Sequence, residues 1–566
     1  MNLCFYDFEV FPLYWCVTVI TYPDGEIVQI EEDQEKLSDF YSKHENDIWI
    51  GYNNKHYDQW IMKATVAGFR PQQMNSWLIE MDKPGWEFSK QLNQFRMINY
   101  DCMDGYRSLK ELEGFMGERI KETPLDFTTN RKLTREEKDL VLQYNLHDVE
   151  QTINVFFEDT SNFDAMTQLV STYHLPLSFI GKTKAGIVAE ILGCRPVKYD
   201  DEWEISLVDT LRIRKYDHIK RWFSDPANYK FGQKLNIHVA GVPHTFGLGG
   251  AHGAVEKFHE KGLFVHVDVA SMYPSIMIRY DLLSRAVTHK ELFKEIYDTR
   301  LKLKREGKKK EQAPYKIILN SMFGISGAEF SDAYDPRRNH EVCINGQLLL
   351  VDLIEHVEGI CRLIQSNTDG LIVQIADTDE AWDKLDDACY EWEQRTGLKL
   401  SFDVIKEIYQ KDVNNYLFIT DDDKIEVKGS YLKKTTKLDN DLPIIKSALT
   451  NFMISGTPVE NTIRSCDTLI DFQKIVKRSS KYESVWHNGK KENDKTFRVF
   501  ASKDQNDSYL GKQKMAGATI EKFGNTPDHC FIWNDGVNGV KVPDYLDKEY
   551  YIGLAKQRLE DFGIGQ

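Results

Sequence analysis

FVHVDVA, ending at Ala270, and NTDGLIVQI, ending at Ile375, are the two stretches that decide the fold of this 566-residue chain. Each places an acidic residue, Asp268 or Asp369, beside a short apolar run, which is typical of a strand in a buried sheet. Neighbouring strands would hold the two carboxylates close together, where they repel each other strongly unless cations bridge them. In-line phosphoryl displacement at a two-metal site needs such a pair.

A third stretch, KIILNSMFG from Lys316, lies between the two acidic stretches in the sequence. Its apolar residues have helical spacing, so one face can pack while Lys316 and Asn320, a turn apart, point the other way. A cation and an amide there suit a triphosphate. The alternative is that each aspartate is a solvated strand end and Lys316 an ordinary surface lysine.

Taken in order, DVASMYPSI from Asp268, KIILNSMFG and SNTDGL resemble motifs A, B and C of the family B DNA polymerases, DxxSLYPSI, KxxxNSxYG and YxDTDS. The resemblance implies that Asp268 and Asp369 bind the catalytic metal ions and that the carbonyl of Val269 completes one metal shell. It also implies that Tyr273 is the steric gate, whose ring fills the space that a ribose 2′-hydroxyl needs. The predicted nucleotide-binding residues are Tyr273, Arg300, Lys304, Lys316 and Asn320.

The chain departs from the family motifs at three positions. Asn367 replaces the first Asp of DTD, Gly370 replaces the Ser after it, and Phe323 replaces the Tyr of motif B. Asn367 can accept a hydrogen bond but lacks the charge, so we expect an altered metal affinity or preference. We expect activity to survive, because the family's indispensable second Asp is present as Asp369.

The first part of the chain carries another set of acidic residues. CFYDFEVF, from Cys4 to Phe11, alternates so that Asp7 and Glu9 project from one face of a strand. QYNLHDVEQT places Tyr144 and Asp148 four residues apart, on one face of a helix that we expect to begin near Leu133. GYNNKHYDQW adds Asn53, Asn54, Tyr57 and Asp58.

These three stretches resemble the ExoI (DxE), ExoII and ExoIII (YxxxD) motifs of the 3′–5′ proofreading exonucleases. The catalytic residues that the resemblance implies are Asp7, Glu9, Asp58, Tyr144 and Asp148. Of these, Asp7, Glu9 and Asp148 would bind two divalent ions, Mg²⁺ or Mn²⁺, as carboxylate oxygens prefer. Tyr144 would orient the attacking water, because a phenol with a pKa near 10 is a poor base at neutral pH.

Six residues are predicted to contact DNA. Asn54 and Tyr57 would hold a single-stranded 3′ end, with the Tyr57 ring as a stacking surface. Gly249 and Gly250 lie in TFGLGGAHGAV. This stretch resembles the YxGG linker of phage polymerases, with Gly247 in place of its Tyr, or is simply a connector between domains. Lys428 and Gly429 resemble the family's KxG-type element.

Composition sets limits on the function. The formal charge of −16 opposes DNA binding, but the run from Arg300 to Lys316 concentrates cations where phosphates would need them. No apolar run approaches the length of a membrane span, and the first residues lead directly into a strand, so we expect no signal peptide and a cytoplasmic protein, in the bacterial host if phage-encoded. Nine cysteines without a CxxC pair indicate reduced thiols and no zinc site.

The spacing between the three motifs indicates which branch of the family the chain resembles. About 48 residues separate Asp268 from Lys316 and about 43 separate Gly324 from Asn367, which leaves room for a two-helix fingers element and little more. The large insertions of the protein-primed phage polymerases are therefore expected to be absent. We predict ordinary primer extension, with a helicase as a possible partner.

The predicted fold is an α/β and α+β multidomain chain with an RNase H-like, DnaQ-type exonuclease followed by a right-hand polymerase. The expected segments are exonuclease 1–160, connector 161–240, palm 241–284 and 326–434, fingers 285–325, and thumb with C-terminal region 435–566. The predicted function is proofreading DNA synthesis in phage genome replication by a monomer, using primer-template DNA, dNTPs and two Mg²⁺ or Mn²⁺ ions per site. The alternatives are an exonuclease whose polymerase half is weak or only binds DNA, and a non-catalytic replication scaffold.

Overall fold

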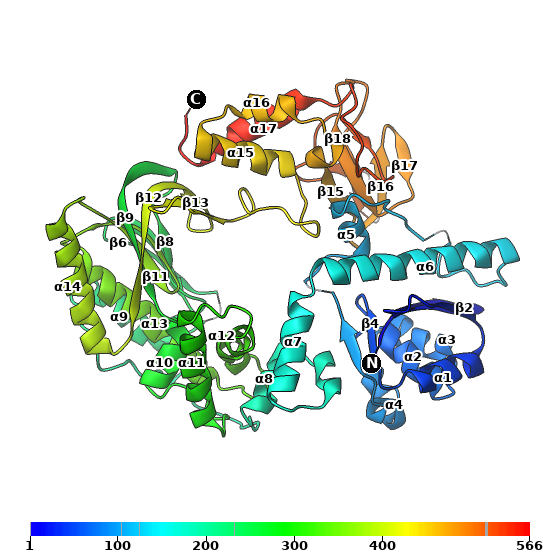
Figure 1. Cartoon of the computed structure of the whole chain (residues 1–566), viewed down its shortest axis with the longest axis horizontal. Coiled ribbons are helices and arrows are strands. Elements are labelled where there is room, and N and C mark those ends of the chain that lie inside the picture. Colours follow the sequence, from blue (N-terminus) through cyan, green and yellow to red (C-terminus); the bar gives the residue numbers. More distant parts are fainter. Residues whose placement is uncertain (1, 104, 124, 231, 515–518, 566) are drawn as a thin grey trace. The chain divides into compact units, whose positions relative to one another are not determined.

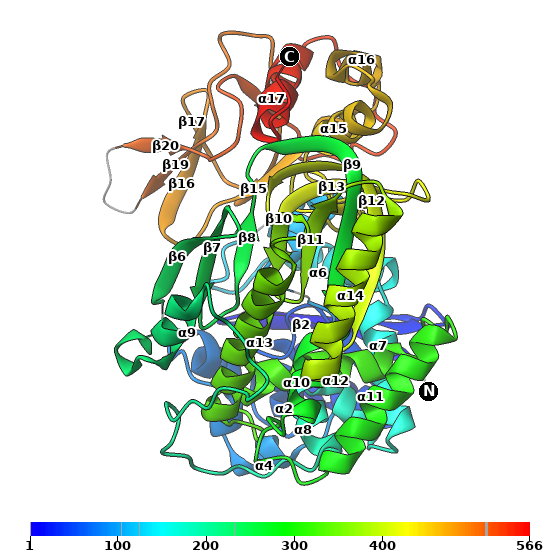
Figure 2. The ribbon, with the colours of Figure 1, turned by 90° about the vertical axis from the view of Figure 1, so that its left-hand side faces the viewer.

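The computed structural model describes residues 2–103, 105–123, 125–230, 232–514 and 519–565 (Figures 1 and 2). Its internal contacts divide the chain into two compact units. Unit 1 comprises Met1–Lys182, Thr435–Ala448 and Pro458–Gly553, and unit 2 comprises Thr183–Lys434, Leu449–Thr457 and Leu554–Gln566. Both units mix helices and strands, which confirms the expected mixed α/β, multidomain class.

Unit 1 opens with a five-stranded sheet in the order β3-β2-β1-β4-β5. The central strand β1 pairs antiparallel with β2 and parallel with β4. Alternate side chains of β1, including Tyr6 and Phe8, enter a core that contains Trp49 and Trp60. The strands are β1 (Leu3–Phe11), β2 (Tyr14–Tyr22), β3 (Ile27–Glu31), β4 (Ile48–Gly51) and β5 (Asn99–Asp101).

The other face of β1 meets helix α6 (Arg135–Glu158), where the Phe5 and Phe156 rings lie 5.3 Å apart. This helix confirms the one predicted from Leu133. It begins at a capping box, in which the Thr134 hydroxyl accepts from Glu137 N at 3.2 Å and the Glu137 carboxylate accepts from Thr134 N at 2.8 Å. Because side chains alternate along a strand, Asp7 and Glu9 share the face that α6 covers.

Further helices surround this sheet or follow it in the chain. They are α1 (Gln34–Lys43), α2 (Asp58–Val66), α3 (Pro71–Asn75), η1 (Ser76–Glu80), η2 (Gly85–Glu87), α4 (Lys90–Gln94), α5 (Leu109–Phe115), α7 (Ser161–Thr172) and η3 (Leu177–Gly181).

The last quarter of the chain returns largely to unit 1. It forms two small sheets, in the orders β15-β18-β21 and β17-β16-β19-β20, over a core that includes Val485, Phe497 and Val499. The elements are α16 (Val459–Ser465), η5 (Leu469–Phe472), β15 (Lys474–Lys477), β16 (Tyr482–His487), β17 (Lys490–Glu492), β18 (Thr496–Ala501), β19 (Gly511–Lys514), β20 (Ile520–Lys522) and β21 (Cys530–Ile532), with α15 (Pro443–Ser455) and α17 (Lys548–Asp561) divided between the units.

Unit 2 is built on a nine-stranded sheet in the order β14-β13-β12-β9-β11-β10-β8-β7-β6, antiparallel throughout. The predicted neighbours are confirmed, because β9 pairs directly with β11. The strands are β6 (Lys234–Val239), β7 (Val242–Gly247), β8 (His252–Ala254), β9 (Phe258–Val269), β10 (Arg362–Asn367), β11 (Gly370–Ile375), β12 (Leu400–Asp412), β13 (Asn415–Thr420) and β14 (Ile425–Lys428).

The helix predicted from Lys316 is also confirmed, as part of α12 (Ala313–Ser326). Ile318, Leu319 and Met322 are buried, whereas Lys316 and Asn320 are exposed, as the spacing predicts. Within the residues described here, no helix has both the length and the apolar character that crossing a membrane requires. The other helices of unit 2 are α8 (Lys184–Ile191), α9 (Asp217–Ser224), η4 (Pro226–Asn228), α10 (Met272–Arg279), α11 (Lys290–Arg305), α13 (Pro336–Val357) and α14 (Asp379–Thr396).

Candidate active sites

The acidic residues of unit 1 converge between β1 and α6. Asp7, Glu9 and Asp148 each offer a carboxylate oxygen, and these three oxygens lie within 4.8 Å of one another. Asn145, on the same helix as Asp148, donates to Asp7 Oδ2 at 2.8 Å. Three carboxylates in this arrangement form a donor set that suits Mg²⁺ or Mn²⁺.

Asp58, the first residue of α2, belongs to the same cluster. Its Oδ1 accepts from Phe8 N at 3.1 Å, so the strand that carries Asp7 and Glu9 also fixes Asp58. Burial raises the pKa of Asp58 to about 7, against the opposing effect of that hydrogen bond. Burial, followed by the neighbouring carboxylates, raises the pKa values of Asp7 and Glu9 well above their usual range. A cation would relieve this repulsion.

Sequence reasoning missed Lys110, which lies on α5. Its ammonium donates to Asp148 Oδ1 at 2.5 Å and to Glu113 Oε1 at 2.8 Å. Burial disfavours the charge, but Asp148 and Glu113 outweigh it and raise the pKa of Lys110. No sequence signal marks this lysine, because KELEGF is an ordinary amphipathic segment.

Tyr144 lies on α6, four residues before Asp148, and is buried. The Asp148 carboxylate acts on its hydroxyl, and the Lys110 ammonium lies 4.7 Å from the centre of its ring. Burial raises the pKa of Tyr144 far above its usual range. A phenol of this kind keeps its proton and serves as a hydrogen-bonding group.

A cavity of about 1160 Å³ opens beside these carboxylates. Asp7, Glu9, Asp58 and Asp148 line one part of it, and Tyr57 belongs to the wall. The wall is otherwise largely apolar or aromatic and includes Ile79, Trp86 and Phe127, each of which is between 42% and 64% exposed. Exposed rings beside an acidic cluster offer stacking surfaces for unpaired bases.

Asn54 does not reach this cavity. It is wholly buried, where its amide exchanges two 3.0 Å hydrogen bonds with Asn99 and also donates to the carbonyl of Tyr100. Asn53 lines the cavity instead, in a left-handed conformation (φ 59°) that Asn tolerates. Asn53 is therefore the asparagine placed to meet a ligand.

The acidic residues of unit 2 meet at the junction of β9 and β11. Gly370 is the register partner of Asp268, and Val269 N donates to the carbonyl of Asp369 at 2.8 Å. Burial and then Asp369 raise the pKa of Asp268 to about 6, while His266 and Lys304 oppose that rise. A neighbouring carboxylate that raises the pKa of Asp268 in this way is what a bridging cation would offset.

Gly370 explains one departure from the motif. A Cβ there would lie 2.8 Å from Val267 O and 3.2 Å from Asp268 Cα, both backbone atoms. The two acidic strands therefore approach as closely as they do because residue 370 has no side chain.

Asn367, the second departure, supports the turn that carries Asp369. Its Oδ1 accepts from Thr368 N at 2.9 Å and from His252 Nδ1 at 3.1 Å. The amide thus caps its own turn and is fixed by β8. A charge at residue 367 is not required for either hydrogen bond.

Tyr273, within motif A, lies on α10. Its ring centre is 4.3 Å from that of Phe323 on α12. A Cβ added at Gly346 of α13 would lie 3.1 Å from Tyr273 Cε1. Helices α12 and α13 therefore fix this ring. Phe323, the third departure, supplies the packing contact without a hydroxyl.

The predicted phosphate-binding cations differ in their surroundings. Arg300 Nη1 donates to Oγ of Ser271, a residue of motif A, at 2.6 Å, and burial lowers the pKa of Arg300. Arg300 Nε is buried and has no hydrogen-bond partner among the described residues. Lys304 and Lys316 are exposed. A buried donor without a partner and two exposed ammonium groups can all donate to polyphosphate oxygens.

Of the three glycines expected to approach DNA, Gly250 and Gly429 have close protein neighbours. A Cβ at Gly250, whose φ is +129°, would lie 3.5 Å from Thr368 Oγ1, so the loop from Gly247 to Ala251 borders the turn of Asp369. A Cβ at Gly249 would meet no atom of the described residues within 4 Å. A Cβ at Gly429 (φ +94°) would lie 2.3 Å from the carbonyl oxygen of Asn414, so the fold itself requires this glycine. The Lys428 ammonium lies 5.7 Å from the centre of the Tyr416 ring.

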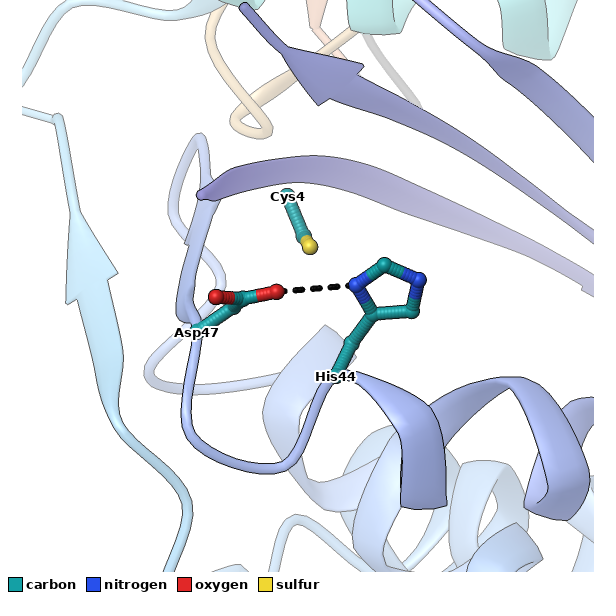
Figure 3. A group of neighbouring side chains, drawn as sticks. All are labelled: Cys4, His44 and Asp47. Carbon is teal, nitrogen blue, oxygen red and sulfur yellow. Dashed lines mark hydrogen bonds and ion pairs between the residues drawn. The ribbon is translucent and has the colours of Figure 1, made fainter. Parts of the chain in front are cut away.

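A separate cluster in unit 1 contains Cys4, His44 and Asp47 (Figure 3). His44 Nδ1 lies 2.8 Å from one Asp47 oxygen, and Asn2 N donates to the other at 2.6 Å. Burial, with Asp47, raises the pKa of the Cys4 thiol to about 12, which disfavours the thiolate that a metal needs. The three residues join the loop before β4 to the start of β1.

Neither a protein-family model nor a curated protein matches the sequence of the chain. Among solved structures, the chain is similar to the family B DNA polymerase from the hyperthermophilic archaeon Pyrobaculum calidifontis, with a TM-score of 0.43 and 14% sequence identity. That alignment covers 100% of this chain and 78% of the polymerase chain.

Proposed function

We propose that the chain is a template-directed DNA polymerase of the family B type with a 3′–5′ proofreading exonuclease. The observation that carries the proposal is the register of β9 with β11, which sets Asp369 beside Asp268. These strands come from motifs A and C, and α12, which carries Lys316, is motif B. Three patterns from distant parts of the sequence thus belong to one unit.

For synthesis, Asp268 and Asp369 would hold two Mg²⁺ or Mn²⁺ ions, together with the carbonyl of Val269. Such ions, when bound, lower the pKa of a primer 3′-hydroxyl and neutralise the charge of a triphosphate. Arg300, Lys304, Lys316 and Asn320 would bind the triphosphate oxygens. Tyr273, fixed between α12 and α13, would exclude a ribose 2′-hydroxyl by contact.

For editing, Asp7, Glu9 and Asp148 would hold the metal ions, with Asp58 beside them. Tyr144 would orient the attacking water through its hydroxyl. The raised carboxyl pKa values and the 4.8 Å grouping support this assignment. The mixed five-stranded sheet, with its acidic residues on the central strand, supports an RNase H-like exonuclease.

The biological setting belongs to the proposal as well. We place the enzyme in phage genome replication, as a monomer in the cytoplasm of a bacterial host, acting on primer-template DNA and dNTPs with a helicase ahead of it. Lys428 and Gly429 would meet the primer-template, and Tyr57 with Asn53 the frayed 3′ end. The second candidate function is an exonuclease whose polymerase half only binds DNA, which Asn367 favours because it removes a charge from motif C.

One experiment separates these functions. Primer extension and digestion of a labelled primer are compared for the wild type, Asp369→Ala and Asp148→Ala, in Mg²⁺ and in Mn²⁺. Asp369→Ala should abolish extension and keep digestion, and Asp148→Ala should do the reverse. Digestion without any extension by the wild type would favour the second candidate, and a chain without either activity would be a scaffold.

A further inference from the structure

Arg498, on β18, is a fully buried arginine in the C-terminal part of unit 1. All its nitrogen atoms donate to neutral oxygens of the protein. Nε donates to Gln473 Oε1 at 3.0 Å, and Nη1 donates to the carbonyls of Trp533 and Asp535 at 3.2 and 2.5 Å. Nη2 donates to the carbonyls of Gly114 and Glu118 at 3.0 and 2.7 Å.

The five hydrogen bonds use the whole donor capacity of a guanidinium. Burial lowers the pKa of Arg498 to about 10, while Glu118 and Asp535 act in the opposite direction, so the side chain stays charged at neutral pH. Removing such a group leaves several buried acceptors unpaired, which is costly. The planar fork of arginine, and not charge alone, satisfies this arrangement.

Two of the acceptors belong to the C-terminal end of helix α5. Gly114 lies in its last turn and Glu118 follows it. Neighbouring groups from the same C-terminal part bind the same end, because Gln473 Nε2 donates to Phe115 O at 3.2 Å and Asn538 Nδ2 donates to Met116 O at 3.0 Å. The unpaired carbonyls that end a helix are thus bound by residues more than 350 positions later in the sequence.

The same helix carries Lys110, one turn before this end, and Glu113, in its last turn. The Lys110 ammonium donates to Asp148 Oδ1 at 2.5 Å and to Oε1 of the wholly buried Glu113 at 2.8 Å. Helix α5 is only seven residues long, so fixing its end fixes the position of Lys110. A continuous set of contacts therefore leads from Arg498 through α5 to the acidic cluster.

We propose that Arg498 is a positioning residue for the exonuclease site, acting through α5 on Lys110 and hence on Asp148. The inference rests on the proposed editing function. It gives the last quarter of the chain a task, namely to hold one wall of a site whose acidic residues all lie in the first 148 residues. A displacement of Asp148 by about 1 Å would be enough to lower the rate of hydrolysis by roughly 100-fold.

The test is Arg498→Lys, which keeps the charge and loses the fork. Hydrolysis of a single-stranded oligonucleotide should show a kcat lowered by roughly 10- to 100-fold with KM little changed, while primer extension stays at the wild-type rate. The matched control is Arg464→Lys, an exposed arginine in the same unit that pairs with Glu549 and should behave as the wild type.

A double-mutant cycle distinguishes positioning from general damage. Lys110→Gln alone should lower kcat, and adding Arg498→Lys should lower it little further, because both changes act on the same contact. Additive effects, or a wild-type kcat in Arg498→Lys, would overturn the inference and leave the exonuclease itself standing. If the wild type hydrolyses nothing, the proposed editing function fails and this inference fails with it.

Asn538→Ala serves if Arg498→Lys does not fold. It removes the amide that donates to Met116 O and to Glu118 Oε1, both at 3.0 Å, at the end of α5. A several-fold lower kcat, with faster hydrogen exchange confined to the amides of α5, supports the clamp. An unchanged kcat in a folded Asn538→Ala protein contradicts it.

Discussion

Gly370→Ala tests the closest approach between the two acidic strands of unit 2. The added Cβ would lie 2.8 Å from Val267 O, 3.1 Å from His266 Nε2 and 3.2 Å from Asp268 Cα, whereas ordinary contact begins near 3.4 Å. The strands must therefore separate by about 0.6 Å at the point where Asp268 meets Asp369. Overpacking of this kind costs about 1–3 kcal/mol of stability.

The catalytic effect should exceed the effect on stability. Because a misplacement of about 1 Å can cost roughly 100-fold in rate, we expect single-nucleotide incorporation by Gly370→Ala to fall roughly 10- to 100-fold. Exonuclease digestion should be unchanged, since that site lies in unit 1. The control is Gly359→Ala, where the new methyl group meets no atom within 4 Å. Wild-type incorporation by a folded Gly370→Ala protein would refute the argument that residue 370 sets the separation of the two aspartates.

Three further predictions concern single residues. The pKa of Asp58 in the folded protein, about 7, lies above the value of about 3.9 in an unfolded chain, so folding takes up protons between these pH values. The free energy of unfolding in EDTA should therefore fall as pH rises from about 4 to about 7. This fall should be smaller in Asp58→Asn, as pH-dependent melting curves will show. His252→Ala removes one of the two hydrogen bonds that Asn367 Oδ1 accepts and should lower the incorporation rate roughly tenfold in a single-turnover assay, whereas a wild-type rate would contradict this role of His252. Tyr273→Ala should raise ribonucleotide incorporation relative to deoxyribonucleotide incorporation by roughly tenfold or more in competition assays, whereas an unchanged ratio would mean that the ring is not the gate.

The elements that carry the acidic residues could be predicted because their patterns are local. The alternation in β1 places Asp7 and Glu9 on one face, and the helical spacing of α12 places Lys316 and Asn320 on its exposed side. The pairing of β9 with β11 followed from two apolar runs with an acidic residue at one end. Such patterns report which way a side chain points within its own element.

Contacts between distant segments could not be predicted in this way. Lys110 reaches Asp148 across 38 residues, and only the path of α5 brings them together. The choice between Asn53 and Asn54 depends on one left-handed residue in the turn, which directs Asn54 into the core against Asn99. Likewise, no periodicity in the last quarter of the chain indicates that it packs with the first 182 residues.

The clamp on α5 also has a consequence for how the molecule is made. Arg498 lies 384 residues after Gly114, so at about 5–20 residues per second a ribosome needs roughly 20–80 s between the two. During that interval the end of α5 lacks the guanidinium that later binds it. A nascent chain released before residue 498 would carry every acidic residue of the proposed editing site and still lack the guanidinium that binds the end of α5. If the proposed editing function holds, full activity at that site would come only with nearly finished translation.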